Sequence, residues 1–161
     1  MKNILVPTDL SIRSLNFLHS LAERQQTPAN IILMHALRLP DSIMDFWAFT
    51  RTGRQHAVIT DNFREACEVM RNRYAQTFLS LEVEFFYGST SPALRNFLQA
   101  HNINEIGLPE NYRYELPCEN SYNPEPLFRK CKVPAFGLQI SQHRRVVTAP
   151  SSISELLGAY H

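Results

Sequence analysis

Glycine is scarce in this sequence, which has only five glycines in 161 residues. Loops that hold phosphates with backbone N–H groups depend on glycine, because a side chain would crowd the contact or forbid the required backbone angle. The P-loop motif, the dinucleotide motif G-x-G-x-x-G and the G-x-S-x-G turn of serine hydrolases are all missing. The sequence therefore carries no signature of these three classes of enzyme.

Metal-binding and disulfide patterns are missing as well. The three cysteines, Cys67, Cys118 and Cys131, are far apart, and no two of them have C-x-x-C spacing. The six histidines include no pair at i and i+4 and no H-E-x-x-H motif, so we assign no metal ligands. His35 follows an apolar run, and we interpret it as a hydrogen-bonded core residue. We expect reduced, mostly structural thiols and no metal.

Long apolar runs and an excess of one charge are also missing. Sixteen Lys and Arg residues balance fifteen Asp and Glu residues, so no large basic face is expected and nucleic acid is not predicted as a partner. No run approaches the length that spans a membrane, and the N-terminus lacks the apolar segment of a signal peptide. We expect a cytoplasmic protein with no membrane partner.

What the sequence does contain is an ordinary globular composition and an alternating series of strands and helices. Hydrophobic types make up 44% and charged types 19% of the residues, which is sufficient for one sizeable core. Such alternation predicts an α/β domain with a five-stranded parallel sheet covered by helices on both faces. The expected strands lie near 4–7, 30–37, 83–86, 104–108 and 134–140. The expected helices run from Ser11 to before Thr27, over 61–79, and from an N-cap at Ser91 to 101, with a helical turn within 127–132.

A long connection runs from Leu39 to about Thr60. It contains Phe46, Trp47 and Phe49, and we expect these aromatic side chains to pack as a satellite core. Two alternatives are that they fill the crevice at the end of the sheet or form an oligomer contact.

Ligands of open α/β sheets bind beyond the carboxyl ends of the strands, where the strand order reverses. In this chain, that crevice should be lined by the turn Thr8–Ser11 after the first strand and by the loop 109–123 after the fourth. These two segments are the candidate functional site.

Four sequence segments together resemble the universal stress protein family. They are Ile4-Leu5-Val6-Pro7-Thr8-Asp9-Leu10-Ser11, Ile32-Leu33-Met34-His35-Ala36, the Tyr87-Gly88-Ser89 step into a helix, and Val133-Pro134-Ala135-Phe136. The resemblance covers roughly residues 1 to 140 and rests on the order and spacing of the segments. It implies a doubly wound, Rossmann-like fold of the adenine-nucleotide-hydrolase type, with strand order 3-2-1-4-5.

The resemblance also implies where ATP would bind. Many members of the family use a glycine motif, G-x2-G-x9-G followed by Ser or Thr, after the fourth strand. The matching positions here are Pro109, Tyr112, Tyr122 and Asn123. Pro109 has no N–H to donate and the tyrosines add bulk, so we expect no ATP cofactor bound through the family motif.

Three residues would contact a nucleotide if one bound: Thr8, Asp9 and Glu110. Two carboxylates facing one crevice would each repel a polyphosphate by about 4 kcal/mol per unit charge at contact. Asp9 also has a structural interpretation, since an aspartate ahead of a helix accepts backbone N–H groups without any ligand, and we favour that role. Thr8 is interpreted in the same way.

We therefore expect a universal-stress-protein-like homodimer of the stress response, with no catalytic residues and no enzymatic activity. One alternative is a nucleotide or other small ligand bound in altered geometry beyond strands 1 and 4. The second is a metal-dependent phosphate hydrolase that uses Asp9 and Glu110. The family resemblance implies dimerisation through the edge strand Pro134 to Ile140.

Residues 141–161 lie outside the resemblance and form a C-terminal tail. Ser152 and Glu155 have capping-box spacing, which predicts a short helix there. Its apolar stripe consists of Ile153, Leu156, Leu157 and Tyr160.

Overall fold

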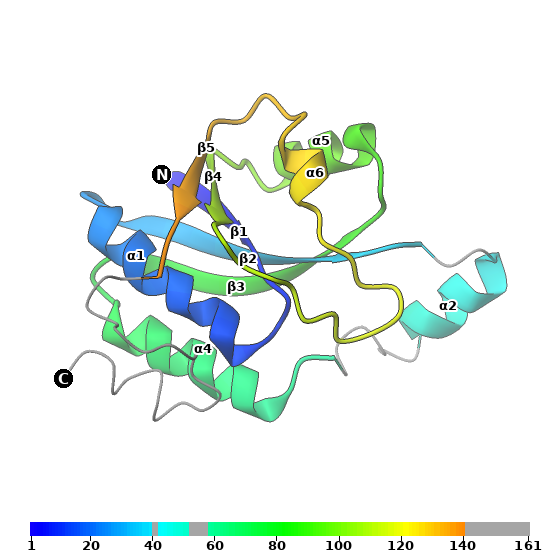
Figure 1. The fold of residues 1–161 in the computed structure, drawn as a ribbon, viewed down its shortest axis with the longest axis horizontal. Helices are drawn as coiled ribbons and strands as arrows, with labels where there is room; N and C mark the ends of the chain where they lie inside the picture. Colours follow the sequence, from blue (N-terminus) through cyan, green and yellow to red (C-terminus); the bar gives the residue numbers. More distant parts are fainter. Residues whose placement is uncertain (40–41, 52–57, 141–161) are drawn as a thin grey trace.

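The computed structural model describes residues 1–39, 42–51 and 58–140. At its centre is an all-parallel five-stranded sheet with the order β3-β2-β1-β4-β5 (Figure 1). The α/β class and the strand order are those expected from the sequence. The strands are β1 (Lys2–Pro7), β2 (Ala29–Leu37), β3 (Phe78–Tyr87), β4 (Glu105–Pro109) and β5 (Ala135–Leu138).

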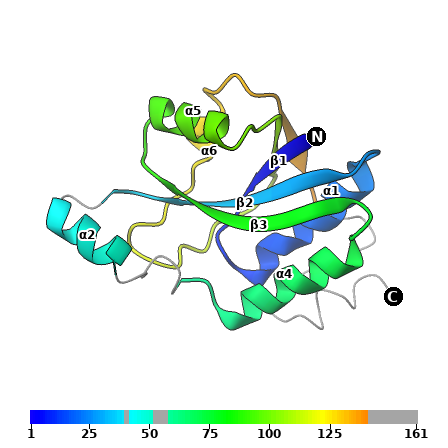
Figure 2. The same ribbon diagram turned by 180° about the vertical axis from the view of Figure 1, so that it is seen from behind.

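Helices cover both faces of the sheet, as predicted. The 3₁₀ helix η1 (Ile12–Asn16) leads into α1 (Phe17–Arg24), which shares one face with α4 (Asp61–Arg73), whereas α5 (Ser91–Ala100) and α6 (Glu125–Phe128) lie on the other face (Figures 1 and 2). Successive side chains of a strand point to opposite faces. Accordingly, Ile4 and Val6 join the core under α1 and α4, while Leu5 joins the core under α5 and α6. Both faces of β1 are therefore buried.

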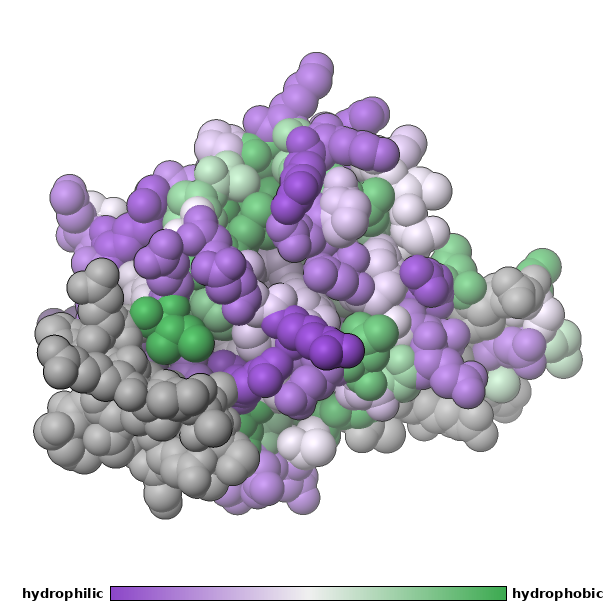
Figure 3. All heavy atoms as spheres, in the orientation of Figure 1, coloured by the Kyte–Doolittle hydropathy of each residue, from purple (hydrophilic) through white to green (hydrophobic). Residues whose placement is uncertain are grey.

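One helix was not expected from the sequence. Helix α2 (Ile43–Arg51) lies in the long connection and stands away from the sheet in both ribbon views (Figures 1 and 2). Trp47 is 62% exposed, and Ile43 and Met44 are also exposed, so hydrophobic side chains are visible at this end of the molecule (Figure 3). The prediction that Trp47 packs in a satellite core is wrong, because α2 extends past the end of β2 and does not lie over the sheet. The side chains of Phe46 and Phe49 lie outside the described part of the chain.

Several boundaries also differ from the prediction. The helical turn expected within 127–132 is α6, which begins at Glu125 and ends at Phe128, and the strand expected near 83–86 is β3, which begins at Phe78. Helix α4 ends at Arg73, and Phe78 begins β3 instead of continuing the helix to residue 79. Phe78 is buried in the same core as the apolar face of α4, so its spacing of four residues from Tyr74 resembled a further helical turn. The N-cap of α5 is Thr90, whose side chain accepts the N–H of Ala93 at 3.3 Å, and not Ser91.

The predicted tail helix falls within residues 141–161, outside the described residues. Among the helices that the structure describes, none combines the length and the apolar character needed to cross a membrane.

Candidate functional site

The turn after β1 lies at the carboxyl end of the sheet, where the order reverses between β1 and β4. Leu10 has φ 65°, an uncommon value for a residue with a side chain, and that side chain is buried. The turn continues into η1, whose N-cap is Ser11. Residues Thr8 and Asp9 are therefore fixed at the mouth of the predicted crevice.

The Asp9 carboxylate is enclosed by its own chain. Its Oδ1 accepts the backbone N–H of Ser11 at 3.0 Å and the Ser11 hydroxyl at 2.6 Å. Its Oδ2 accepts the Tyr112 hydroxyl at 2.6 Å and the backbone N–H of Glu115 at 2.8 Å. With four donors on two oxygens and only 1% of the residue exposed, the carboxylate has little acceptor capacity left for a ligand.

Tyr112 is held in place from several sides. Its ring meets Phe17 edge-on at 5.2 Å and Tyr114 at 5.6 Å, and the guanidinium of Arg13 lies 4.8 Å from the ring centroid. Burial, followed by the hydrogen bond to Asp9, raises the pKa of Tyr112 well above its ordinary value. Burial also raises the pKa of Tyr114. The Tyr112 hydroxyl therefore stays protonated at neutral pH and donates its hydrogen to Asp9.

Thr8 also has partners within its own chain. Its backbone N–H donates to the Met34 carbonyl at 2.9 Å, its hydroxyl lies 2.8 Å from the Ser14 hydroxyl, and its Oγ1 accepts the N–H of Leu10 at 3.0 Å. The residue is buried. The structural interpretation of Thr8 and Asp9 is thus consistent with every contact that they make here.

Beyond Glu115, the same loop continues across the carboxyl ends of β2 and β3. The N–H of Arg38 donates to the Asn120 carbonyl at 2.8 Å, and the N–H of Tyr122 reaches the Ala36 carbonyl at 3.4 Å. The Tyr122 hydroxyl donates to the carbonyl of Gly88, just after β3. Burial raises the pKa of Tyr122 to about 12, so this hydroxyl also acts as a donor. We call residues 110–124 the closing loop.

Two of the four positions that match the family's glycine motif, Tyr112 and Tyr122, take part in this closure. Pro109 ends β4, Tyr112 binds Asp9, and Tyr122 binds the turn after β3. The Asn123 side chain accepts the N–H of Glu125 at 3.0 Å, at the start of α6. No glycine stands at any of the four positions, and two of them carry bulky rings that lie across the sheet end.

Glu110 makes a separate set of contacts. Its N–H donates to the Leu138 carbonyl at 2.8 Å, and its carboxylate accepts the side-chain amide of Gln139 at 2.9 Å. The side chain lies so close over Gly137 that a Cβ there would overlap its carboxylate. Glu110 therefore sits against β5, and none of these contacts is shared with Asp9.

His35 connects the end of β2 to the closing loop, a link that the sequence did not reveal. Its Nδ1 lies 2.8 Å from the Thr8 carbonyl and its Nε2 lies 2.7 Å from the Ser121 hydroxyl, which in turn lies 3.1 Å from the Cys118 sulfur. Burial lowers the pKa of His35, so the neutral ring donates from Nδ1 and accepts the Ser121 hydroxyl at Nε2. The prediction of a hydrogen-bonded core histidine is confirmed.

Metal coordination gains no support from the described residues. Over residues 1–39, 42–51 and 58–140, no three His, Cys, Asp or Glu side chains are grouped as metal ligands would be.

Comparison with known proteins identifies the fold. No protein-family model matches the sequence, and no curated protein matches it. Among solved structures, the universal stress protein UspA from Lactobacillus plantarum is 16% identical, with a TM-score of 0.56 over 85% of this chain and 97% of that chain. The hypothetical protein PH0823 is 16% identical, with a TM-score of 0.57 over 88% of this chain and 97% of that chain.

The hypothetical protein MJ0577 is similar to the same extent, at 15% identity and a TM-score of 0.54, over 88% of this chain and 97% of that chain. Identities this low establish the fold and leave the activity open. Each match spans nearly the whole of the other protein, and the strand order is the one that the resemblance implied. The chain therefore has the fold of the universal stress proteins.

Proposed function

We propose that this protein is a universal-stress-protein-like homodimer that acts in a stress response through contacts with other proteins, without ATP in the family's crevice. The observation that carries the proposal is the enclosed Asp9 carboxylate. Two of its four donors, Tyr112 and Glu115, come from the loop that would carry the glycine motif in an ATP-binding relative.

The energetic argument concerns what a nucleotide would have to displace. To reach Asp9, a ligand must remove the Tyr112 hydroxyl and the Glu115 N–H from the carboxylate. Hydrogen bonds to a charged group contribute about 1.5–3 kcal/mol each, so opening both would lower the apparent affinity by roughly two to four orders of magnitude. A ligand that bound here would need contacts strong enough to offset this loss.

The dimer interface that we propose is the edge strand Pro134 to Ile140. Within the described residues, β5 pairs only with β4, so its outer edge is open. The Leu138 carbonyl accepts from Glu110 and the Pro134 carbonyl accepts from Ile106. Because alternate residues of a strand turn their backbone groups to opposite sides, Ala135 and Gly137 direct theirs to the open edge. A second copy of β5 would satisfy these groups.

A cytoplasmic location fits the same proposal. Cys67, Cys118 and Cys131 are free thiols, as expected of a protein that works in a reducing compartment.

The alternative of a small ligand in altered geometry requires the closing loop to leave Asp9. The alternative of a metal-dependent hydrolase requires Asp9 and Glu110 to act together, but the Glu110 carboxylate accepts from Gln139 and shares no hydrogen-bond partner with Asp9. Neither alternative is favoured by a specific contact.

Thermal unfolding of the full chain with ATP, AMP and magnesium tests the proposal, together with native mass spectrometry of freshly purified protein. A ligand that binds the folded state raises the unfolding midpoint. We expect a ligand-free dimer whose midpoint is unchanged by either nucleotide, with or without magnesium. A co-purified nucleotide, or a shift that Asp9→Asn abolishes, would overturn the proposal in favour of the small-ligand alternative.

A further inference from the structure

A groove on the α5 and α6 face of the sheet is separate from the Asp9 site. It runs between α5 and the segment from α6 to β5, with a volume of about 590 Å³. This size lies within the range of small-molecule sites. No residue of the turn Thr8–Ser11 and none of the closing loop lines it. The groove is therefore a second candidate binding site, separate from the one around Asp9.

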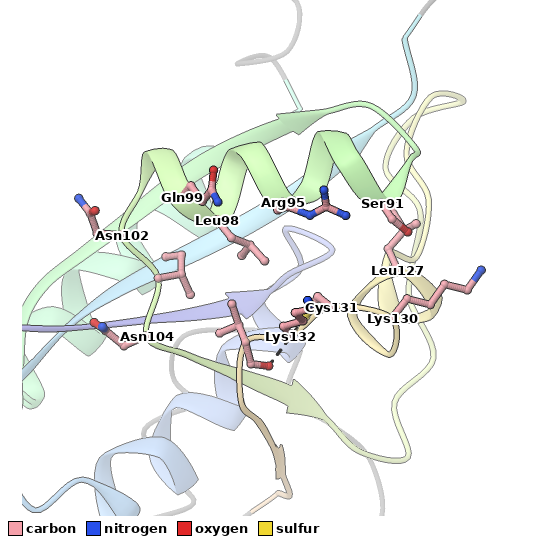
Figure 4. Close-up of a pocket in the computed structure, with 12 residues that line it drawn as sticks. Ser91, Arg95, Leu98, Gln99, Asn102, Asn104, Leu127, Lys130, Cys131 and Lys132 are labelled. Atoms are coloured by element: carbon pink, nitrogen blue, oxygen red, sulfur yellow. Dashed lines mark hydrogen bonds between the residues drawn. The ribbon is translucent and has the colours of Figure 1, made fainter.

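The floor of the groove is apolar. Leu98 and Ile103 are buried members of the core on this face, and Leu127 and Val133 pack against the same core while remaining partly exposed. Figure 4 shows Leu98 pointing from α5 into the space that faces the segment 127–132. A ligand with a hydrocarbon or aromatic body would cover apolar surface that now faces water.

The rim of the groove is cationic. Arg95, Lys130 and Lys132 line it, all three are exposed, and no Asp or Glu is among the lining residues. No ion pair is formed by any of the three within residues 1–39, 42–51 and 58–140. In contrast, the neighbouring Arg129 pairs with Glu125 at 2.7 Å. Three cations with no carboxylate around an apolar floor are complementary to an anion.

Polar side chains line the groove near the end of α5. They are those of Gln99, Asn102 and Asn104. The Asn104 side chain already accepts the N–H of Asn3 at 2.8 Å, so it serves as a wall at this end. Figure 4 shows Arg95 on the side of α5 that faces the segment 127–132, and Lys130 extending outward. One acidic group at the Arg95 and Lys132 rim, with its body over Leu98, fits this arrangement.

We propose that this groove binds a small amphipathic anion, namely a carboxylate attached to an apolar body of medium chain length. The carboxylate pairs with Arg95 and Lys132, and the apolar body lies over Leu98, Leu127 and Val133. Arginine is suited to this role because its planar guanidinium matches a carboxylate with two parallel hydrogen bonds. The inference does not depend on the proposed function, because it uses none of the residues around Asp9.

The reactivity of Cys131 can report whether the groove is occupied. Cys131 lines it and is partly exposed, whereas Cys118, also partly exposed, lies in the closing loop and outside the groove. Decanoate, used below its micelle concentration, is the probe. We expect decanoate to slow alkylation of Cys131 by N-ethylmaleimide severalfold and to leave the rate at Cys118 unchanged, as measured by peptide mass spectrometry. Equal slowing at both thiols, or at neither, would overturn the proposal.

Calorimetric titration then separates the charge from the apolar body. Decanol has the same apolar body without the charge, and we expect it to bind more weakly than decanoate. Arg95→Gln and Lys132→Gln should each weaken decanoate binding about two- to fivefold, as the loss of an exposed charge pair predicts, and should leave decanol binding unchanged. Arg64→Gln, which removes an exposed cation on α4 that pairs with Asp61, is the control for net charge and should leave both titrations unchanged.

Two results in this titration would contradict the inference. Equal binding of decanoate and decanol would show that the cations take no part. If Arg64→Gln weakened decanoate binding as much as Arg95→Gln does, the effect would come from the net charge of the protein and not from the groove. All three substitutions are at exposed side chains, and the thermal unfolding midpoint verifies that each variant is folded.

Discussion

At the scale of single residues, the central feature is a buried carboxylate that accepts four hydrogen bonds from its own chain. A buried charge is stable only when it is paired or fully hydrogen-bonded. Asp9 achieves this with four donors, two from its own turn and two from the closing loop. The contact between Asp9 and Tyr112 is therefore a structural link and, in our proposal, the contact that closes the crevice.

Removing one hydroxyl tests this link. Tyr112→Phe keeps the ring and deletes a donor to a charged acceptor, so we expect the free energy of unfolding at pH 7 to fall by about 1.5–3 kcal/mol. Tyr114→Phe is the matched control, since its hydroxyl bonds to no residue in the described part of the chain, and we expect a change below about 0.5 kcal/mol. Denaturant unfolding measures both.

A double-mutant cycle with Asp9→Asn identifies the partner. If the hydroxyl acts through Asp9, the effect of Tyr112→Phe becomes much smaller in the Asp9→Asn background. An effect of the same size in both backgrounds would show that Tyr112 stabilises the fold by another route.

His35 gives stability a dependence on pH. Burial lowers its pKa in the folded state, so the unfolded chain binds this proton more readily. The free energy of unfolding is therefore highest above the ordinary histidine pKa of about 6.5 and falls as pH decreases from there towards the folded-state pKa. Titration of His35 also changes the ring that accepts the Ser121 hydroxyl.

The variant His35→Asn removes this titration. At pH 7.5, we expect it to lower the free energy of unfolding by about 1–3 kcal/mol, because Ser121 loses its acceptor. Between pH 7.5 and 5.5, its stability should change less steeply than that of the wild type. An unchanged slope in His35→Asn would assign the pH dependence to other groups.

At the scale of secondary structure, helix α5 depends on one capping side chain. Thr90 accepts the N–H of Ala93, so Thr90→Ala should lower the free energy of unfolding by about 1 kcal/mol. Ser91 is the first helical residue, and Ser91→Ala should change it by less than about 0.5 kcal/mol. The two adjacent substitutions delete similar hydroxyls, and thermal or denaturant unfolding compares them directly. The reverse ranking would place the cap at Ser91.

The helices and strands differ in how well the sequence predicted them. The short apolar runs of β1 and β2 are local signals, and both strands were predicted. Helix α2 was missed because it packs on no sheet face and so has no buried stripe to reveal it. The end of α4 was misplaced because Phe78 is buried in the same core that the helix faces.

The candidate site was predicted only in part, for a related reason. Thr8 and Asp9 were placed at the carboxyl end of the sheet because a parallel strand ends there. The partners that close the site are far away in the chain: Tyr112 lies 103 residues from Asp9, and Ser121 lies 86 residues from His35. No local pattern reports such pairings, and they became visible only in the folded chain.

At the scale of the whole molecule, two exposed surfaces can join a second copy: the open edge of β5 and the apolar side of α2. We expect the edge to be used. Ala135→Pro removes an N–H that points to the open side and leaves the bonds to β4 intact, so it should convert the proposed dimer to a monomer. Sedimentation analysis reports the mass.

The matched control for the dimer is a double variant on α2, Met44→Ser with Trp47→Ser, which removes two exposed apolar side chains. It should leave the dimer intact. If this variant were a monomer and Ala135→Pro remained a dimer, the interface would be formed by α2 and not by β5.

The closing loop also sets the order of events when the chain is made. The contacts of Asp9 with Tyr112 and Glu115 span 103 and 106 residues. On the ribosome, β1, β2 and β3 emerge long before those partners, and contacts of high sequence separation form last. The nascent sheet therefore exposes an open crevice with an aspartate at its mouth, and the chain itself fills that crevice only after Tyr112 and Glu115 have been made.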